Sequence, residues 1–207
     1  MSTYKELIGK YVRSVSSDPS AGYAEGEIWY NTSSNTFKTA VNVFAWSSGG
    51  AYPVAIQSGA GFGTQTAAVG AGGTPPGNVG LKTFEYNGSS WTAGNNMSRT
   101  PTGSPYLSAY ITGSGILTAG WAAGGGYPTA ASNVENYDGT TWTASAALPA
   151  GRGQGNSSGP QTAGVYFGGS TGSPPRTALN TTFEYDGEGW TAGGNLNTNR
   201  VNAGGSG

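Results

Sequence analysis

The sequence lacks several residue types on which common protein chemistry depends. It contains no cysteine and no histidine, and only 9% of its 207 residues are charged. Without cysteine there can be no disulfide or thiol chemistry, and without histidine the usual general base and commonest metal ligand are missing. A formal net charge of −1 offers no basic surface to a nucleic acid. No apolar run reaches the roughly 18 residues of a membrane span, so neither nucleic-acid binding nor membrane insertion is expected.

Glycine, by contrast, is abundant. The 38 glycines and 11 prolines approach the level at which low complexity is suspected. Aromatic residues nevertheless make up 12% of the chain, whereas disordered chains are poor in aromatics. The glycines also recur in register with the aromatic residues, which favours a folded repeat protein.

One phrase occurs three times. It reads EYNGSSWTAGNNM at 85–97, NYDGTTWTASAAL at 136–148 and EYDGEGWTAGGNL at 184–196. An Asn-Gly or Asp-Gly pair follows each tyrosine, and a two-residue type I′ turn needs positive φ at both such positions. Each phrase therefore predicts a strand that ends at tyrosine, a tight turn, and a strand that begins at tryptophan. The aromatic positions are Tyr86, Trp91, Tyr137, Trp142, Tyr185 and Trp190.

Other features repeat with the phrase at intervals of about 50 residues. Upstream lie the runs TAAVGAGG, ILTAGWAAGGG and AGVYFGG, which suit buried strands closed by Gly-Gly. Downstream lies an arginine in each case: Arg99, Arg152 or Arg200. These arginines could stabilise the architecture or bind anions and sugars at a shared rim.

Each unit contains, in order, an arginine, a strand closed by Gly-Gly, a tyrosine and a tryptophan. This order resembles the kelch-repeat family of the galactose-oxidase type, whose units are four-stranded antiparallel propeller blades. The resemblance covers residues 46–200 and implies an all-β partial propeller. Its repeats would span 51–98, 99–151 and 152–200, with the last one incomplete. It also implies that the six aromatic residues pack between blades and that each arginine bonds to neighbouring backbone. The alternative is that the aromatics are exposed ligand platforms. About three blades leave open edges, so the chain is expected to be a fragment of a longer propeller or to associate with further copies that cover the edges; a homo-oligomer is the expected partner state.

Residues 1–50 do not follow the repeat. Tyr4, Leu7, Ile8 and Tyr11 have helical spacing, but Gly9 interrupts the pattern, so a short helix and an extended segment both stay open. The stretch EGEIWYNTSSNTFKTA predicts a hairpin with strands IWYN and TFKT and a turn at residues 32–35.

This opening, SSDPS followed by GEIWYNTSSNTFK, resembles the N-termini of virion proteins from tailed bacteriophages, particularly marine ones. The resemblance implies that residues 1–50 dock on other virion proteins and that residues 51–207 form a tail-fibre-like or adaptor-like part. It also implies assembly in the host cytoplasm and location in the virion. The candidate docking residues are Tyr4, Leu7, Ile8, Tyr11, Ile28, Trp29 and Tyr30.

The acidic residues recur with the repeat. Glu85 and Glu184 precede the tyrosine, and Asp138 and Asp186 lie in the turns. A general acid/base pair occurs once, in dissimilar environments, so an architectural role is favoured over a glycoside-hydrolase pair. No catalytic, cofactor or metal-binding residue is predicted, and the chain is not expected to be an enzyme.

Three functions stay open in this order. The first is a virion structural component, the second a host-surface glycan-binding module used in host attachment, and the last a hydrolase. The predicted glycan-binding loops are TPPGNVG at 74–80, GYPTAAS at 126–132 and STGSPPRTAL at 170–179.

Overall fold

The structure is a computed structural model, which describes residues 12–18, 27–39, 48–74, 80–99, 108–172 and 175–205. These residues form fifteen strands and no helix, so the predicted all-β fold is confirmed. The chain divides into two compact units, Met1–Ser48 and Gly49–Gly207. The predicted docking residues Tyr4, Leu7, Ile8 and Tyr11 lie outside the described residues.

The first unit contains a three-stranded sheet in the order β1-β2-β3. Strand β1 (Arg13–Val15) pairs in parallel with β2 (Ile28–Asn31), which pairs antiparallel with β3 (Thr36–Thr39). Strands β2 and β3 are the predicted hairpin. Its turn ends at Asn35, whose φ of 52° is a left-handed conformation that asparagine tolerates. Strand β1 follows the segment for which a helix and an extended structure both stay open, and that segment lies outside the described residues.

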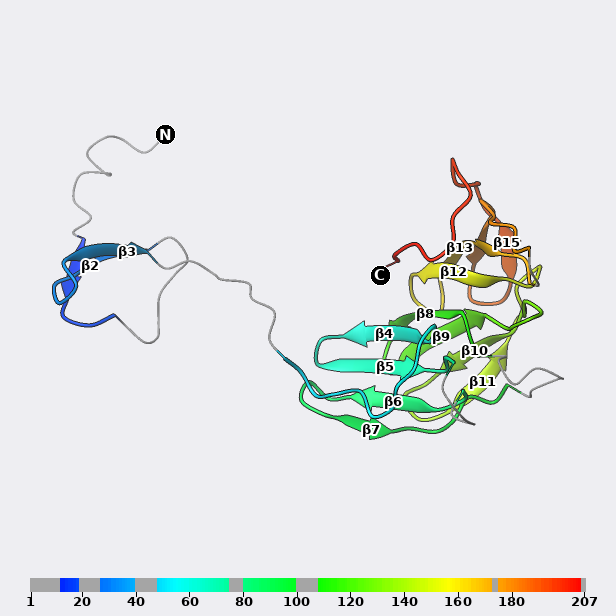
Figure 1. The fold of residues 1–207 in the computed structure, drawn as a ribbon, viewed down its shortest axis with the longest axis horizontal. Coiled ribbons are helices and arrows are strands. Elements are labelled where there is room, and N and C mark those ends of the chain that lie inside the picture. Colours follow the sequence, from blue (N-terminus) through cyan, green and yellow to red (C-terminus); the bar gives the residue numbers. More distant parts are fainter. Residues whose placement is uncertain are drawn as a thin grey trace. The chain divides into compact units, whose positions relative to one another are not determined.

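The described residues of the second unit form three four-stranded antiparallel sheets, each built from consecutive strands (Figure 1). The first sheet contains β4 (Ala60–Thr64), β5 (Ala67–Ala71), β6 (Thr83–Tyr86) and β7 (Trp91–Ala93). The second contains β8 (Ile111–Ile116), β9 (Ala119–Gly124), β10 (Val134–Tyr137) and β11 (Trp142–Ser145). The third contains β12 (Gly153–Ser158), β13 (Gly164–Ser170), β14 (Thr182–Tyr185) and β15 (Trp190–Ala192). The arrangement is blade-like, and β8 lies beside both β4 and β12.

The core lies between the sheets rather than inside any one of them. Phe62, Val69 and Ala71 of the first sheet pack with Tyr137 and Trp142 of the second. A second cluster joins the second and third sheets and contains Trp121, Ala123, Val134, Leu148, Tyr166 and Phe183. Each sheet therefore gains its apolar burial from its neighbour, as expected of a repeat that cannot bury its faces alone.

The predicted hairpins form, but the predicted turn type is wrong. Tyr86 pairs directly with Trp91, so four residues rather than two connect the strands. Gly88 has a φ of 93°, whereas Asn87 is not among the described residues with positive φ. Instead the Asn87 side-chain oxygen accepts hydrogen bonds from the backbone N–H groups of Ser89 and Ser90, at 3.0 and 2.9 Å. The side chain itself thus organises the turn, which is the usual role of Asn or Asp in an Asx turn. Asp138 and Asp186 repeat this arrangement.

Candidate functional site

The repeated tyrosine and tryptophan lie side by side on adjacent strands. Their ring centroids are 5.0 Å apart in the first sheet, 4.7 Å in the second and 4.9 Å in the third. In the second sheet this pair faces the first sheet. The Tyr137 hydroxyl donates to Glu85, and Trp142 Nε1 donates to Thr83 Oγ1 at 2.8 Å. Burial, followed by the bond to Glu85, raises the pKa of Tyr137.

The third sheet packs on the second in a similar way. Trp190 Nε1 donates to the Ala146 carbonyl at 3.0 Å, and its ring centroid lies 5.4 Å from that of Trp121. The Tyr185 hydroxyl lies 3.0 Å from Ser145 Oγ. The aromatic residues of the second and third sheets are thus contacts between sheets. They are not exposed ligand platforms.

The equivalent pair of the first sheet has a different neighbour. Trp91 Nε1 donates to the Gly50 carbonyl at 3.2 Å, and the Tyr52 ring lies 4.8 Å from the Trp91 ring. Beside them is an apolar cavity of about 670 Å³, lined mainly by β4, β5 and residues 52–59. The Tyr52 hydroxyl is buried without a hydrogen-bond partner among the described residues, and burial raises its pKa to about 12. This cavity could hold an apolar ring.

Threonine appears three residues before the tyrosine in the first and third sheets. Thr83 accepts the Trp142 N–H, whereas the hydroxyl of Thr182, which is 8% exposed, has no hydrogen-bond partner in the described structure. Sequence analysis missed this position, although the recurrence of Thr83 and Thr182 in the repeat was a usable signal.

These two threonines make a matched test. Thr83→Val would leave a buried indole N–H without an acceptor, so the free energy of unfolding should fall by about 1–3 kcal/mol. Thr182→Val removes a hydroxyl that is already unsatisfied, so stability should stay within about 1 kcal/mol of the original or rise. Urea unfolding followed by circular dichroism measures both changes. Equal losses in the two variants would contradict the assigned partners.

The acidic residues of the repeat also have architectural partners. Asp138 accepts hydrogen bonds from the Thr141 and Thr140 backbone, with the Thr141 backbone bond contributing most to the lowered pKa of Asp138. The Gly189 and Glu188 backbone N–H groups lower the pKa of Asp186 in the same way. Among the described residues, no group of three or more Asp, Glu, His or Cys could hold a metal ion.

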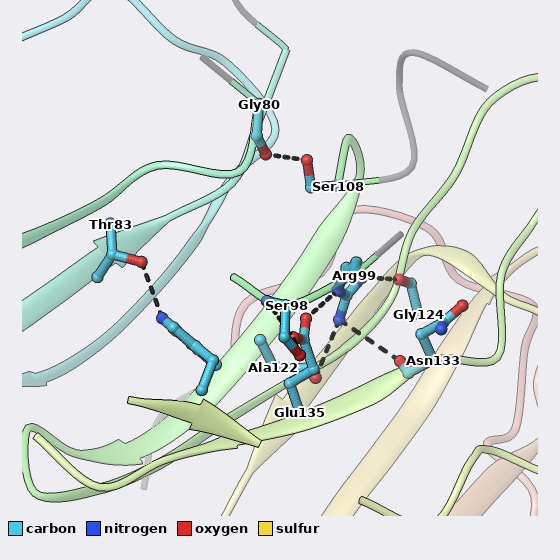
Figure 2. A network of polar contacts seen from close by, with 10 residues as sticks. Gly80, Thr83, Ser98, Arg99, Ser108, Ala122, Gly124, Asn133 and Glu135 are labelled. Carbon is cyan, nitrogen blue, oxygen red and sulfur yellow. Dashed lines mark hydrogen bonds and ion pairs between the residues drawn. The ribbon is translucent and has the colours of Figure 1, made fainter. Parts of the chain in front are cut away.

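Arg99 and Glu135 form a buried ion pair at the second sheet (Figure 2). They are 4% and 1% exposed, and Arg99 Nε lies 2.6 Å from Glu135 Oε2. Glu135 Oε1 also accepts bonds from the Ser98 backbone N–H and hydroxyl. The remaining guanidinium nitrogens donate to the carbonyls of Gly124, Ala122 and Asn133. Burial lowers the pKa of Arg99, and the Glu135 charge opposes that shift. The Arg99 side chain is therefore buried and bonded within the protein, so it does not serve as a ligand-binding group.

The other two repeated arginines behave differently from Arg99. Arg152 lies over the Phe183 ring, with 5.3 Å from the guanidinium carbon to the ring centroid. Arg152 also donates to Thr181 Oγ1 at 3.4 Å, while its Nε is buried and has no partner in the described structure. Arg200 is exposed, and its backbone carbonyl accepts the Gly169 N–H.

The first strands of the three sheets enclose a central groove of about 320 Å³. Its wall contains four residues with positive φ, three of them at or just before the first strand of a sheet and the fourth after β15. They are Ser58, Tyr110, Gln154 and Asn202, with φ between 52° and 61°. A backbone ladder connects them: the N–H of each donates to the carbonyl of the one before. The described residues that line the groove include no charged side chain. The hydroxyl, amide and backbone groups of the groove are suited to bind a neutral polar ligand.

Two of the three predicted glycan-binding loops meet beside this groove. Tyr127 belongs to GYPTAAS and Arg176 to STGSPPRTAL, and the Arg176 guanidinium lies over Tyr127 and over Tyr110 of the groove wall. In TPPGNVG, residues 75–79 lie outside the described part.

In the first unit, Asp18 holds the sheet together. Its side chain accepts bonds from Trp29 Nε1 at 3.0 Å and Asn31 Nδ2 at 2.7 Å, and it forms an ion pair with Lys38. The Lys38 bond, then those from Asn31 and Trp29, lower the pKa of Asp18 to about 2. Trp29 is 8% exposed and Ile28 is 53% exposed, so of these two predicted docking residues only Ile28 presents its side chain to solvent. Tyr30 is half-buried against Phe37.

Because the Asp18 carboxylate bonds to both paired strands, we expect the stability of the first unit to fall in acid. The lowered pKa of Asp18 means that its contribution to stability is present above the ordinary value of 3.8 and is lost as the pH falls toward 2. The Trp29 indole N–H resonance should therefore shift between pH 4 and pH 2 in a two-dimensional ¹H–¹⁵N spectrum. In Asp18→Asn this pH dependence should vanish, and an unchanged titration in that variant would contradict the assignment.

The comparisons with known proteins concern the fold alone. No protein-family model matches the chain, and no curated protein does. The solved structure of YjhT is similar, with a TM-score of 0.52 and 15% sequence identity. The match covers 81% of this chain and 50% of YjhT, so the chain spans half the length of that protein. Among the described residues, no helix is long and apolar enough to cross a membrane.

Proposed function

We propose that this chain is a non-enzymatic structural component of a phage virion, such as a tail fibre or tail adaptor. The observation that carries the proposal is that carboxylates of the second unit have architectural partners. Glu85 and Glu135 bind residues at the interface between the first two sheets, and Asp138 and Asp186 organise turns. In this proposal the second unit is a rigid domain that is exposed on the virion appendage.

The first unit is the proposed docking part. It is compact by itself, and its small sheet leaves apolar side chains in solvent. Ile28 is 53% exposed and Phe37 is 69% exposed. Exposed apolar side chains of this size on a small sheet are suited to contact with another virion protein.

The test is mass spectrometry of purified virions from a phage that encodes the chain. We expect the protein in a fixed ratio to the other appendage proteins. Phe37→Asp should reduce its incorporation severalfold, because the aspartate would be desolvated at the contact. Thr36→Asp places the same charge on the neighbouring strand position and serves as the matched control. Absence of the protein from virions would overturn the proposal.

A second candidate function is binding of a host-surface glycan. The observation that favours it is the meeting of Tyr127 and Arg176, from two separate loops, beside the uncharged central groove. This role is compatible with the first, because a virion appendage can also carry the receptor-binding surface.

A further inference from the structure

Arg176 contacts two tyrosine rings, and one of these tyrosines, Tyr110, lines the central groove. Its guanidinium carbon lies 4.5 Å from the centroid of the Tyr110 ring and 5.0 Å from that of Tyr127. The two rings are 6.5 Å apart. Tyr110 precedes β8, Tyr127 follows β9, and Arg176 lies between β13 and β14. Three separate segments of the fold therefore bring these side chains together.

No carboxylate neutralises Arg176 within the described residues. The ion pairs Lys38–Asp18 and Arg99–Glu135 do not include Arg176. A guanidinium that stacks through its face keeps the N–H groups at its edge free to donate. Those N–H groups match the two oxygens of a carboxylate or sulfate in a bidentate contact.

The groove beside Arg176 supplies groups of a different kind. Tyr110 belongs to both, because its residue lines the groove while its ring contacts Arg176. Gln154, Asn156 and Asn202 add amides to the wall, and Asn156 Nδ2 is buried without a partner among the described residues. Tyr127 is 36% exposed. Tyr110 thus connects the cationic Arg176 and the Tyr127 ring to the groove that carries the neutral amides.

We propose that this site binds an acidic oligosaccharide, one that carries a carboxylate or a sulfate group. The acidic group pairs with Arg176, a sugar ring lies against Tyr127, and sugar hydroxyls bond to the amides of the groove. The volume of about 320 Å³ is at the lower end for a small-ligand site, which suits one or two sugar rings. The proposal rests on the glycan-binding candidate and adds the charge class of the ligand and the residues that select it.

The test is isothermal titration calorimetry of the full chain with three disaccharides: one sulfated, one containing a uronic acid, and one neutral. We expect at least one acidic disaccharide to bind at least tenfold more tightly than the neutral one, and the affinity to fall as NaCl rises. The stronger of the two acidic ligands identifies which anionic group Arg176 prefers.

Two variants assign the binding to this site. Arg176→Gln should weaken binding of the acidic disaccharide at least tenfold, while Arg13→Gln, the same charge change in the first unit, should leave it within twofold. Asn202→Gly should weaken it severalfold; glycine preserves the φ of 52° at this position while removing the amide.

Three results would overturn the inference. Equal binding of neutral and acidic disaccharides would reject the charge class but leave the glycan-binding candidate intact. Acidic binding that Arg176→Gln does not change would reject the site. No binding of any disaccharide by the folded chain would reject both, without bearing on incorporation into virions.

Discussion

Replacing Glu135 by alanine is expected to lower the free energy of unfolding of the second unit by about 3–5 kcal/mol. Arg99 is 4% exposed, and Glu135 is the single acidic partner that it contacts in the described structure. Removal of the carboxylate would leave a buried guanidinium charge whose remaining partners are backbone carbonyls. The Ser98 backbone N–H would also lose its acceptor. Urea unfolding followed by circular dichroism, with the linear slope held common to the variants, measures the change.

Two further variants separate the ion pair from a general effect of losing an acidic residue. Glu184→Ala removes an exposed carboxylate from the third sheet, and such surface changes usually stay within about 0.5 kcal/mol. The double variant Arg99→Met with Glu135→Leu should recover part of the loss, because it removes both charges, although the Ser98 N–H still lacks its acceptor. A loss below about 1 kcal/mol in Glu135→Ala would mean that the carbonyls alone hold the guanidinium.

The repeat in the sequence could not reveal this ion pair. The residues equivalent to Glu135, two before the tyrosine, are Phe84 and Phe183. Arg152 lies over Phe183 where Arg99 meets Glu135. At the equivalent position between sheets, the arginine therefore forms an ion pair with a carboxylate in one case and a cation–π contact with an aromatic ring in the other. Both arrangements stabilise an arginine, but no shared residue type marks them along the chain.

The strands next to the repeated aromatics were predictable because their signals are local. Strand β6 ends at Tyr86 and β7 begins at Trp91, as the phrase predicts, and the other two sheets follow the same rule. An aromatic strand residue followed by Asn-Gly or Asp-Gly is specified by neighbouring positions alone. Only the turn type differed, because the Asn87 side chain, and not a second positive φ, closes the turn.

The sequence pattern did not predict the first strand of each sheet, because close packing requires residues there that are poor strand formers. Strand β12 reads GQGNSS, and glycine is depleted in strands. A Cβ atom on Gly155 would lie 2.2 Å from the Tyr166 ring and hydroxyl, so the close approach of β13 requires glycine there. That requirement comes from tertiary contacts. The groove that these strands line was therefore also invisible in the sequence.

Replacing Trp142 by alanine is the second change with a large expected effect, a loss of about 3–5 kcal/mol in the free energy of unfolding. Trp142 is 6% exposed. It contacts Phe62 of the first sheet and Tyr137 of its own, at ring-centroid distances of 6.2 and 4.7 Å. Its N–H bond to Thr83 crosses the same interface. Alanine would open a cavity between two sheets and leave the Thr83 hydroxyl without its donor.

Trp91 provides the matched control, because it occupies the same repeat position and stacks on the equivalent tyrosine. It is half-buried, and its neighbour is the segment with Gly50 and Tyr52, not another sheet. Trp91→Ala should therefore cost about 1–2 kcal/mol, close to an ordinary substitution. The difference between the two variants, measured by urea unfolding, isolates the contribution of packing between sheets. Equal losses would mean that the tryptophan stabilises its own sheet, and the repeated phrase would then specify hairpins and not the joining of one sheet to the next.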